Sequence, residues 1–204
     1  MARSHLSWMG VLDDGLAEAM LRRPWAVAGR LLRRGPLTRL GRNWSFAHVA
    51  ARTCFFDDHV LRALDDGVSQ VVVIGAGYDS RAWRLARPGV RFFEVDHPAT
   101  QADKRARAPR GGPSYVATDL ARHRLAEMLP AAGFVVGGTA VFMLEGLTMY
   151  LTESTLTELL ATLAQLGGAG SRLVANFGVR GRRSRSLGWR SRSAALGSLA
   201  AFGR

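Results

Sequence analysis

Residues 71–96 read VVVIGAGYDSRAWRLARPGVRFFEVD, and this stretch decides the fold of the chain. Four consecutive apolar residues, 71–74, are typical of a buried strand, and Gly75 and Gly77 follow at once. The letters RAWRL then favour a helix, and RFFEV a second strand. A strand, glycines, a helix and a further strand in this order belong to a βαβ unit of an α/β protein.

The glycines and the acids after the second strand have the chemistry of a nucleotide-cofactor cradle. Glycines after a strand bring backbone N–H groups close to a ligand, and a carboxylate at the end of the next strand can accept both hydrogen bonds of a ribose diol. Glu94 and Asp96 stand where this carboxylate is expected, and Asp96 follows Gly75 by 21 residues. A dinucleotide motif would place its third glycine at Ser80, where no glycine stands. The sequence therefore favours a cofactor with adenine and ribose but no pyrophosphate, of which S-adenosylmethionine is the common one.

The rest of the chain continues the alternation of strands and helices. Further strands are predicted at residues 114–117, 140–144 and 172–177, with helices at 100–110, around 122–129, and from 152 to the glycines at 167 and 168. Five strands with intervening helices predict a doubly wound, largely parallel, Rossmann-like sheet.

We expect one structural domain with three parts. Residues 1–66 read as an N-terminal helical cap, residues 67–177 as the cofactor-binding core, and residues 178–204 as a basic tail of low information. A sheet that ends at its fifth strand leaves an edge exposed. The C-terminal part of the sheet is then missing from this chain, disordered, or replaced by a partner.

Composition and charge exclude several classes of protein. The longest uncharged apolar stretch, residues 131–144, is shorter than the roughly 20 residues that span a bilayer, so no membrane helix is expected. Asp13, Asp14 and Glu18 disfavour a secretory signal, which makes cytoplasmic the expected location. The net charge of +12 comes almost entirely from arginine, and the tail lacks aromatic residues in a nucleic-acid motif, so nucleic-acid binding is disfavoured.

No metal site is predicted from the cysteine and the histidines. Cys54 is the single cysteine, and none of the five histidines stands with it or with another at metal-ligand spacing. Cys54 lies among apolar residues and reads as a small core residue.

Acidic residues follow four successive strands. In a parallel sheet all carboxyl ends meet at one edge, where ligands bind. The candidate site residues are those at these ends: the segment Gly75, Ala76, Gly77 and Asp79, then Asp96, then Asp119 with Leu120, and finally residues 145–150.

Four blocks resemble the leucine carboxyl methyltransferase-like family of S-adenosylmethionine-dependent methyltransferases, in its bacterial O-methyltransferase branch. They are RTCFFDD (52–58), VVVIGAGYDSRAWRL (71–85), FFEVDHPATQADKR (92–105) and FMLEGLTMYL (142–151). The resemblance covers most of residues 45–177 and implies a class I methyltransferase fold. Members of the family normally continue past the fifth strand, which this chain does only with its basic tail.

The resemblance also implies roles for the candidate residues. Gly75 and Gly77 would line the methionine part of S-adenosylmethionine, Asp96 would hold the ribose hydroxyls, and Asp119 with Leu120 would contact the adenine.

At the other end of the cofactor, Arg52 would pair with the carboxylate, Glu145 would meet the amino group, and Tyr150 would shape the methyl-transfer pocket. Structural alternatives are a surface ion pair of Arg52 with Asp57 or Asp58, a helix cap for Glu145, and a core position for Tyr150.

The predicted function is O-methyl transfer to a carboxylate or hydroxyl acceptor. Tyr150 is the pocket candidate, and no catalytic side chain is identified. Two alternatives stay open. One is a truncated or non-catalytic module that binds the cofactor or an acidic partner, and the other is an NAD(P)-dependent oxidoreductase, against which the missing third glycine and Asp79 count. The sequence does not define the acceptor or the oligomeric state.

Overall fold

A computed structural model describes residues 14–20, 44–120 and 124–178. Within these residues five strands form one sheet: β1 (Gln70–Ile74), β2 (Arg91–Asp96), β3 (Ser114–Ala117), β4 (Ala140–Leu144) and β5 (Arg172–Ala175). The strand order is β3-β2-β1-β4-β5, and every neighbouring pair is parallel. The predicted parallel sheet is confirmed.

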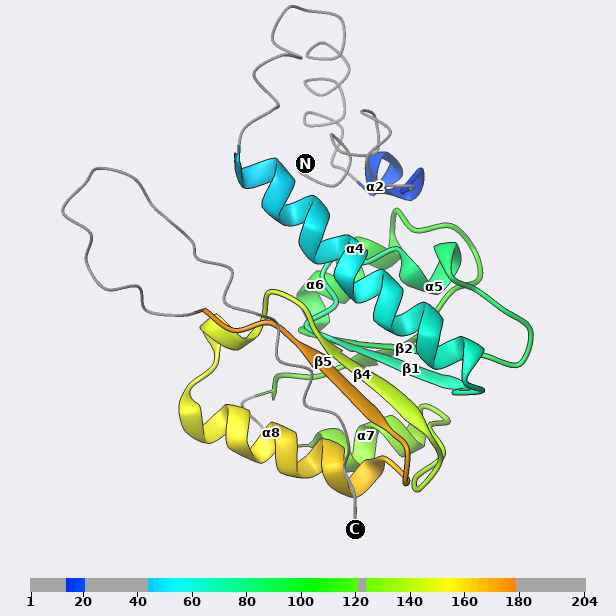
Figure 1. The fold of residues 1–204 in the computed structure, drawn as a ribbon, viewed down its shortest axis with the longest axis vertical. Coiled ribbons are helices and arrows are strands. Elements are labelled where there is room, and N and C mark those ends of the chain that lie inside the picture. Colours follow the sequence, from blue (N-terminus) through cyan, green and yellow to red (C-terminus); the bar gives the residue numbers. More distant parts are fainter. Residues whose placement is uncertain (1–13, 21–43, 121–123, 179–204) are drawn as a thin grey trace, which may run out of the picture.

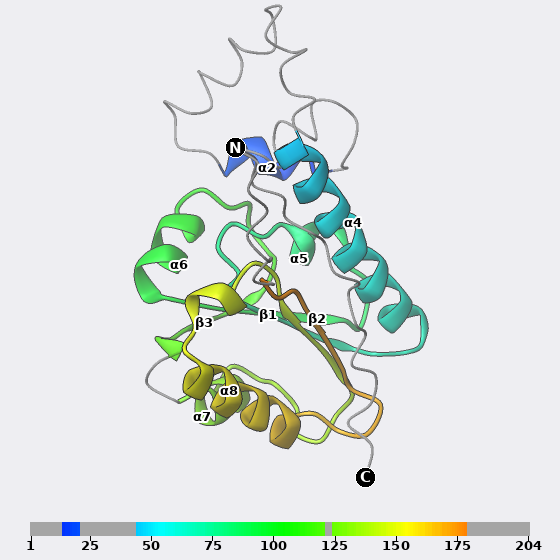
Figure 2. The ribbon, with the colours of Figure 1, turned by 60° about the vertical axis from the view of Figure 1, so that its left-hand side comes forward.

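Helices cover both faces of the sheet (Figures 1 and 2). The described helical elements are α2 (Leu16–Ala19), α4 (Trp44–Asp65), α5 (Arg81–Arg84), α6 (Pro98–Arg105), α7 (Leu125–Ala131), the 3₁₀ helix η3 (Thr148–Tyr150) and α8 (Glu153–Leu166). α4, α5 and α6 lie on one face, and α7 with α8 lies on the other. This is the doubly wound, Rossmann-like α/β arrangement that the sequence predicted.

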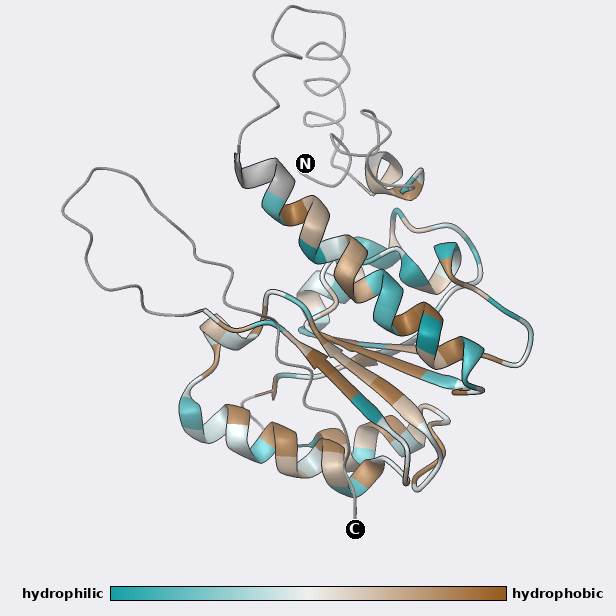
Figure 3. Cartoon of the chain, viewed as in Figure 1, coloured by the Kyte–Doolittle hydropathy of each residue, from teal (hydrophilic) through white to brown (hydrophobic). Residues whose placement is uncertain are grey.

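The central strand β1 is buried on both faces, which explains its unbroken apolar run. Val72 and Ile74 belong to a core with residues of α7 and α8, while Val71 and Val73 pack with residues of α4. These two apolar layers, one on each face of the sheet, correspond to the brown strands and the brown inner faces of the helices in Figure 3. α4 is therefore a layer of the sandwich and packs directly on the sheet.

One predicted helix and one predicted strand were too long. The helix expected at 100–110 is α6, which begins at Pro98 after an N-cap at His97 and ends at Arg105, before Pro109 could interrupt it. The strand expected to reach Phe177 ends at Ala175, and the side chain of the next residue, Asn176, bonds to the loop that follows β4. Its Oδ1 accepts the Gly146 N–H at 2.7 Å.

Parts of the expected organisation lie outside the described residues. These are residues 1–13 and 21–43 of the predicted cap, residues 121–123 before α7, and residues 179–204 of the predicted tail. In the portion that the structure describes, no helix combines the length and the apolar character needed to cross a bilayer.

Candidate functional site

The predicted site residues follow the carboxyl ends of adjacent strands. Because the sheet runs β3-β2-β1-β4, the edge carries Asp119 after β3, Asp96 at the end of β2, the glycine loop (residues 75–80) after β1, and Glu145 after β4. Neighbouring strands lie about 4.8 Å apart, so the row spans about 14 Å. The polar groups thus form a line across the edge of the sheet.

The glycine loop is fixed by bonds to the end of β2. Gly75 has φ +67° and Gly77 has φ +51°, backbone conformations that residues with a side chain rarely adopt. The Gly75 N–H donates to the Val95 carbonyl oxygen at 2.8 Å. The space over Gly77 is open, since an added Cβ would meet no atom within 4 Å. The loop therefore presents backbone to an open side.

Asp96 is held by two backbone N–H groups. The Gly77 N–H donates to Oδ2 at 2.5 Å and the His97 N–H to Oδ1 at 2.6 Å. A carboxylate has about four acceptor positions, so each oxygen keeps one for a further donor. Asp96 is half-buried, which leaves the carboxylate oriented by the protein and within reach of a ligand.

Glu94, the other acid of β2, has a structural partner. Its carboxylate is buried under α6, with the Lys104 Nζ 2.5 Å from Oε2. The Lys104 ammonium also lies 5.5 Å from the centre of the Trp83 ring. Burial raises the pKa of Glu94 to about 7, against the lowering effect of Lys104. Of the two acids that the sequence offered for the ribose, Asp96 is the one at the open edge.

A buried arginine, Arg81, lies behind the glycine loop among three carboxylates. Its Nε is 2.5 Å from Asp57 Oδ1, its Nη2 is 2.8 Å from Glu145 Oε2, and its Nη1 pairs with Asp79. The Arg81 side chain is fully buried. Burial alone would lower the pKa of the guanidinium, but Asp79, Glu145 and Asp57 outweigh it and raise the pKa. Arg81 is thus a fixed positive charge.

Arg52 and Glu145, predicted to hold the two ends of a zwitterion, form an ion pair with each other. Arg52 Nε donates to Glu145 Oε1 at 3.0 Å. The alternative pairing of Arg52 with Asp57 or Asp58 was wrong, because the carboxylate that Arg52 contacts is Glu145, and Asp57 pairs with Arg81 and Arg84. Glu145 caps no described helix, since η3 and α8 begin after Leu147 and Thr152.

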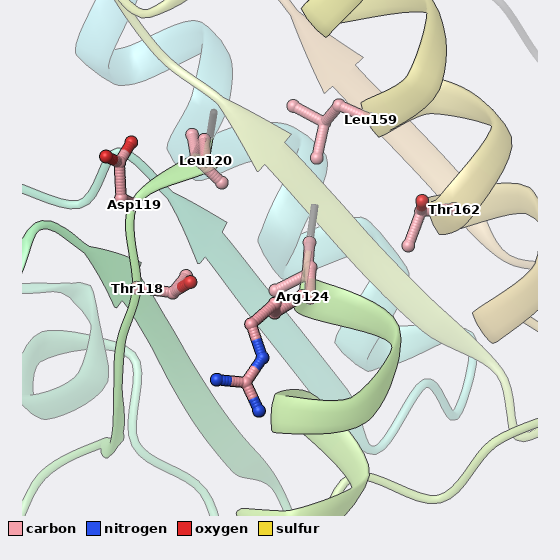
Figure 4. Close-up of a pocket in the computed structure, with 7 residues that line it drawn as sticks. Thr118, Asp119, Leu120, Arg124, Leu159 and Thr162 are labelled. Carbon is pink, nitrogen blue, oxygen red and sulfur yellow. The ribbon is translucent and has the colours of Figure 1, made fainter. Parts of the chain in front are cut away.

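Asp119 and Leu120 line a small pocket beside the edge. Thr118, Asp119 and Leu120 come from the segment after β3, Arg124 and Leu125 from the start of α7, and Leu159 and Thr162 from α8 (Figure 4). The two residues predicted to contact adenine are therefore neighbours in a recess with apolar and polar walls.

Tyr150 is not a core residue. It lies on η3 with 79% of its surface exposed, so the alternative of a buried aromatic was wrong. Met149 and Phe177 are also exposed large apolar residues. The assignment of Tyr150 to a methyl-transfer pocket stays a prediction.

Sequence reasoning missed Arg81 and Asp57 as parts of the site. A signal was present on α4. Thr53 and Asp57 are polar, stand four residues apart and so share one face of the helix, next to the buried apolar residues Phe56 and Val60. Both contact Arg81, Thr53 through its carbonyl oxygen at 3.4 Å.

Comparison with known proteins gives a consistent picture. A family model described as leucine carboxyl methyltransferase matches residues 4–164. A predicted S-adenosyl-L-methionine-dependent methyltransferase of Parafrankia is 38% identical over 176 residues, covering 80% of this chain and 55% of the relative. One of Streptomyces coelicolor is 36% identical over 182 residues, covering 83% and 64%. The chain spans a little over half the length of these two relatives.

Solved structures are more distantly similar. A predicted methyltransferase from Thermobifida fusca has a TM-score of 0.49 at 17% identity, covering 86% of this chain and 65% of its own. Magnesium protoporphyrin IX methyltransferase from Synechocystis, with bound SAM, has a TM-score of 0.47 at 16% identity, covering 78% of both chains. Similarities of this size carry no information on what the present chain binds.

Proposed function

Because the chain belongs to the leucine carboxyl methyltransferase family, we propose that it binds S-adenosylmethionine and transfers the methyl group to an oxygen of an acceptor. One observation carries the proposal. The order of groups along the sheet edge, from Asp119 through Asp96 and the glycine loop to Glu145, matches the order adenine, ribose and amino acid in an extended cofactor.

The ribose fits at Asp96. Two backbone N–H groups orient its carboxylate, and the remaining acceptor position on each oxygen suits one hydroxyl of a vicinal diol. A hydrogen bond to a charged acceptor is worth about 1.5–3 kcal/mol. Asp96 would thus supply both affinity and the orientation of the ribose.

The amino-acid end fits between Arg52 and Glu145. Their ion pair at 3.0 Å offers a cationic fork and a carboxylate, the complement of an α-carboxylate and an α-ammonium. A zwitterion can take the place of this internal pairing without leaving either charge alone. Asp119 and Leu120, in the pocket of Figure 4, would hold the adenine.

The protein's task in this reaction is mainly positioning. S-Adenosylmethionine, held by these residues, would supply an electrophilic methyl group on its sulfonium, to which an acceptor oxygen would form the new bond. Holding the two reactants in line can contribute about 7–11 kcal/mol without a catalytic side chain. The residues named above would fix the cofactor's ribose, base and amino acid, and so the place of its methyl group.

A carboxylate is the acceptor that the site supports best. A carboxylate is ionised at pH 7 and needs no general base, whereas a hydroxyl does. His97 is the histidine next to Asp96, and its Nδ1 accepts the Ala99 N–H at 3.3 Å as the N-cap of α6. Its ring is thus engaged in capping.

A pyrophosphate-containing cofactor is poorly supported. The position of the third dinucleotide glycine is Ser80, a fully buried residue, and the helix that follows, α5, has only four residues. A helix of one turn offers little dipole to a pyrophosphate.

Calorimetric titration tests the proposal. The chain should bind S-adenosylmethionine and S-adenosylhomocysteine saturably with one site and should not bind NAD. Incubation with S-adenosylmethionine and a panel of carboxylic and hydroxylic acceptors should then yield S-adenosylhomocysteine. Binding of NAD alone, or of none of these ligands, would contradict the proposal, and binding without turnover on any acceptor would favour a non-catalytic module.

A further inference from the structure

We propose that Arg81 is a positioning residue for the amino-acid end of the cofactor. It holds Glu145 from the inside of the protein, so that the outer partner of Glu145, Arg52, can exchange for a ligand. The inference rests on the proposed function and concerns a residue that does not itself touch the ligand.

Arg81 joins three separate segments of the site. Asp57 comes from α4, Asp79 from the glycine loop, and Glu145 from the segment after β4. A further bond runs from the Arg81 Nη2 to the Thr53 carbonyl oxygen on α4, at 3.4 Å. One guanidinium therefore sets the position of the glycine loop relative to Glu145.

The two arginine partners of Glu145 differ in their surroundings. Arg81, 2.8 Å from Oε2, has no exposed side-chain surface, whereas Arg52, 3.0 Å from Oε1, is 26% exposed. Water and a ligand can reach the outer ion pair from the Arg52 side, and an ion pair is weaker where solvent reaches it. The inner pair is shielded, and breaking it would strand a buried charge, which is costly. The ammonium of an amino acid would accordingly displace Arg52 and leave Arg81 in place.

The geometry requires arginine at this position. A planar guanidinium presents five N–H donors in a fixed fork, which here reach three carboxylates and a carbonyl. A lysine would keep the charge but offers one ammonium, which cannot span the same partners. An Arg81→Lys variant thus changes the positioning of Glu145 while preserving the net charge.

The test compares two ligands that differ only at the amino-acid end. S-Adenosylhomocysteine carries the amino acid, and 5′-methylthioadenosine lacks it. In Arg81→Lys we expect binding of S-adenosylhomocysteine to weaken about tenfold or more, because Glu145 would lose the shielded ion pair that holds it, and binding of methylthioadenosine to change less than about twofold.

Arg87→Lys is the control. Arg87 pairs with Asp65 at 2.7 Å on the surface, and among the described residues it shares no ion-pair partner with Arg81. Both ligands should bind this variant within about twofold of the wild-type protein, because the contacts of Glu145 are unchanged. Equal losses for the two ligands in Arg81→Lys, or no loss for either, would overturn the inference. A wild-type protein that binds neither ligand would instead refute the proposed function.

A second measurement on the wild-type protein covers the case in which Arg81→Lys does not fold. Guanidinium Nε–H signals are followed by nuclear magnetic resonance, with Arg52→Lys and Arg84→Lys assigning their own signals. S-Adenosylhomocysteine should shift the Arg52 signal, and methylthioadenosine should not. An Arg52 signal that does not shift when S-adenosylhomocysteine binds would overturn the proposed exchange of Arg52 for the ligand.

Discussion

Replacing Asp96 by asparagine tests the ribose subsite. The substitution keeps the size of the side chain but removes the charge and converts one acceptor oxygen into an NH₂ donor. Of the Gly77 and His97 N–H groups, now bonded to Oδ2 and Oδ1, only one would then keep its acceptor. One of these two N–H groups would face another donor, which disturbs the glycine loop as well as the ribose.

The expected loss of affinity follows from the bonds involved. Two hydroxyls bonded to a charged acceptor are worth about 1.5–3 kcal/mol each at full strength. Because Asp96 is half-buried, solvent screening reduces this, and a total of about 2–3 kcal/mol is reasonable. Binding of S-adenosylhomocysteine should therefore weaken about 30- to 150-fold.

Calorimetric titration measures this change, with thermal unfolding to verify the fold. Asp65→Asn is the control, since Asp65 is an exposed carboxylate, paired with Arg87 at 2.7 Å on the surface. The control should bind S-adenosylhomocysteine as the wild-type protein does. An Asp96→Asn variant that is folded and binds within about twofold of wild type would refute the ribose assignment.

Three further predictions concern stability. Gly75→Ala should lower the free energy of unfolding by about 1–2 kcal/mol, because φ at this position is +67° and the new Cβ would lie 2.9 Å from a Leu147 methyl group. Urea unfolding measures this change, and an unchanged midpoint would contradict the predicted backbone strain. Thr152→Ala should cost about 1 kcal/mol, since Oγ1 accepts the Thr155 N–H at 3.2 Å and caps α8; a change below about 0.3 kcal/mol in the same assay would argue against the cap. Burial, opposed by Lys104, raises the pKa of Glu94 from 4.5 to about 7, so the folded state binds this proton more tightly than the unfolded state does. The stability that results is complete below pH 4.5 and is lost as the pH rises to about 7. The unfolding free energy of the wild-type protein minus that of Glu94→Gln should fall across this window, and a constant difference would contradict the raised pKa.

The sequence predicted the sheet because its central strands, β1 and β4, are buried on both faces. Residues 71–74 are an unbroken apolar run, and β1 lies in the middle of the sheet with strands on both sides. The glycines and Asp96 were also predictable, since a turn with positive φ and a carboxylate at a strand end have fixed places along the chain.

Long-range ionic contacts were not predictable from spacing. Arg81 and Glu145 are 64 residues apart, and only the folded sheet shows that one guanidinium lies among Asp57, Asp79 and Glu145. The pairing of Glu94 with Lys104 depends in the same way on how α6 packs on β2. Two acids of one strand thus acquired different roles from tertiary burial.

The most direct measurement is a crystal structure of the chain with S-adenosylhomocysteine. The account predicts the adenine beside Asp119 and Leu120, the ribose diol on Asp96, and the amino acid between Arg52 and Glu145, with the Arg81–Glu145 ion pair retained. A ligand bound away from this edge, or bound in the reverse direction with its amino acid beside Asp119, would contradict the central claim.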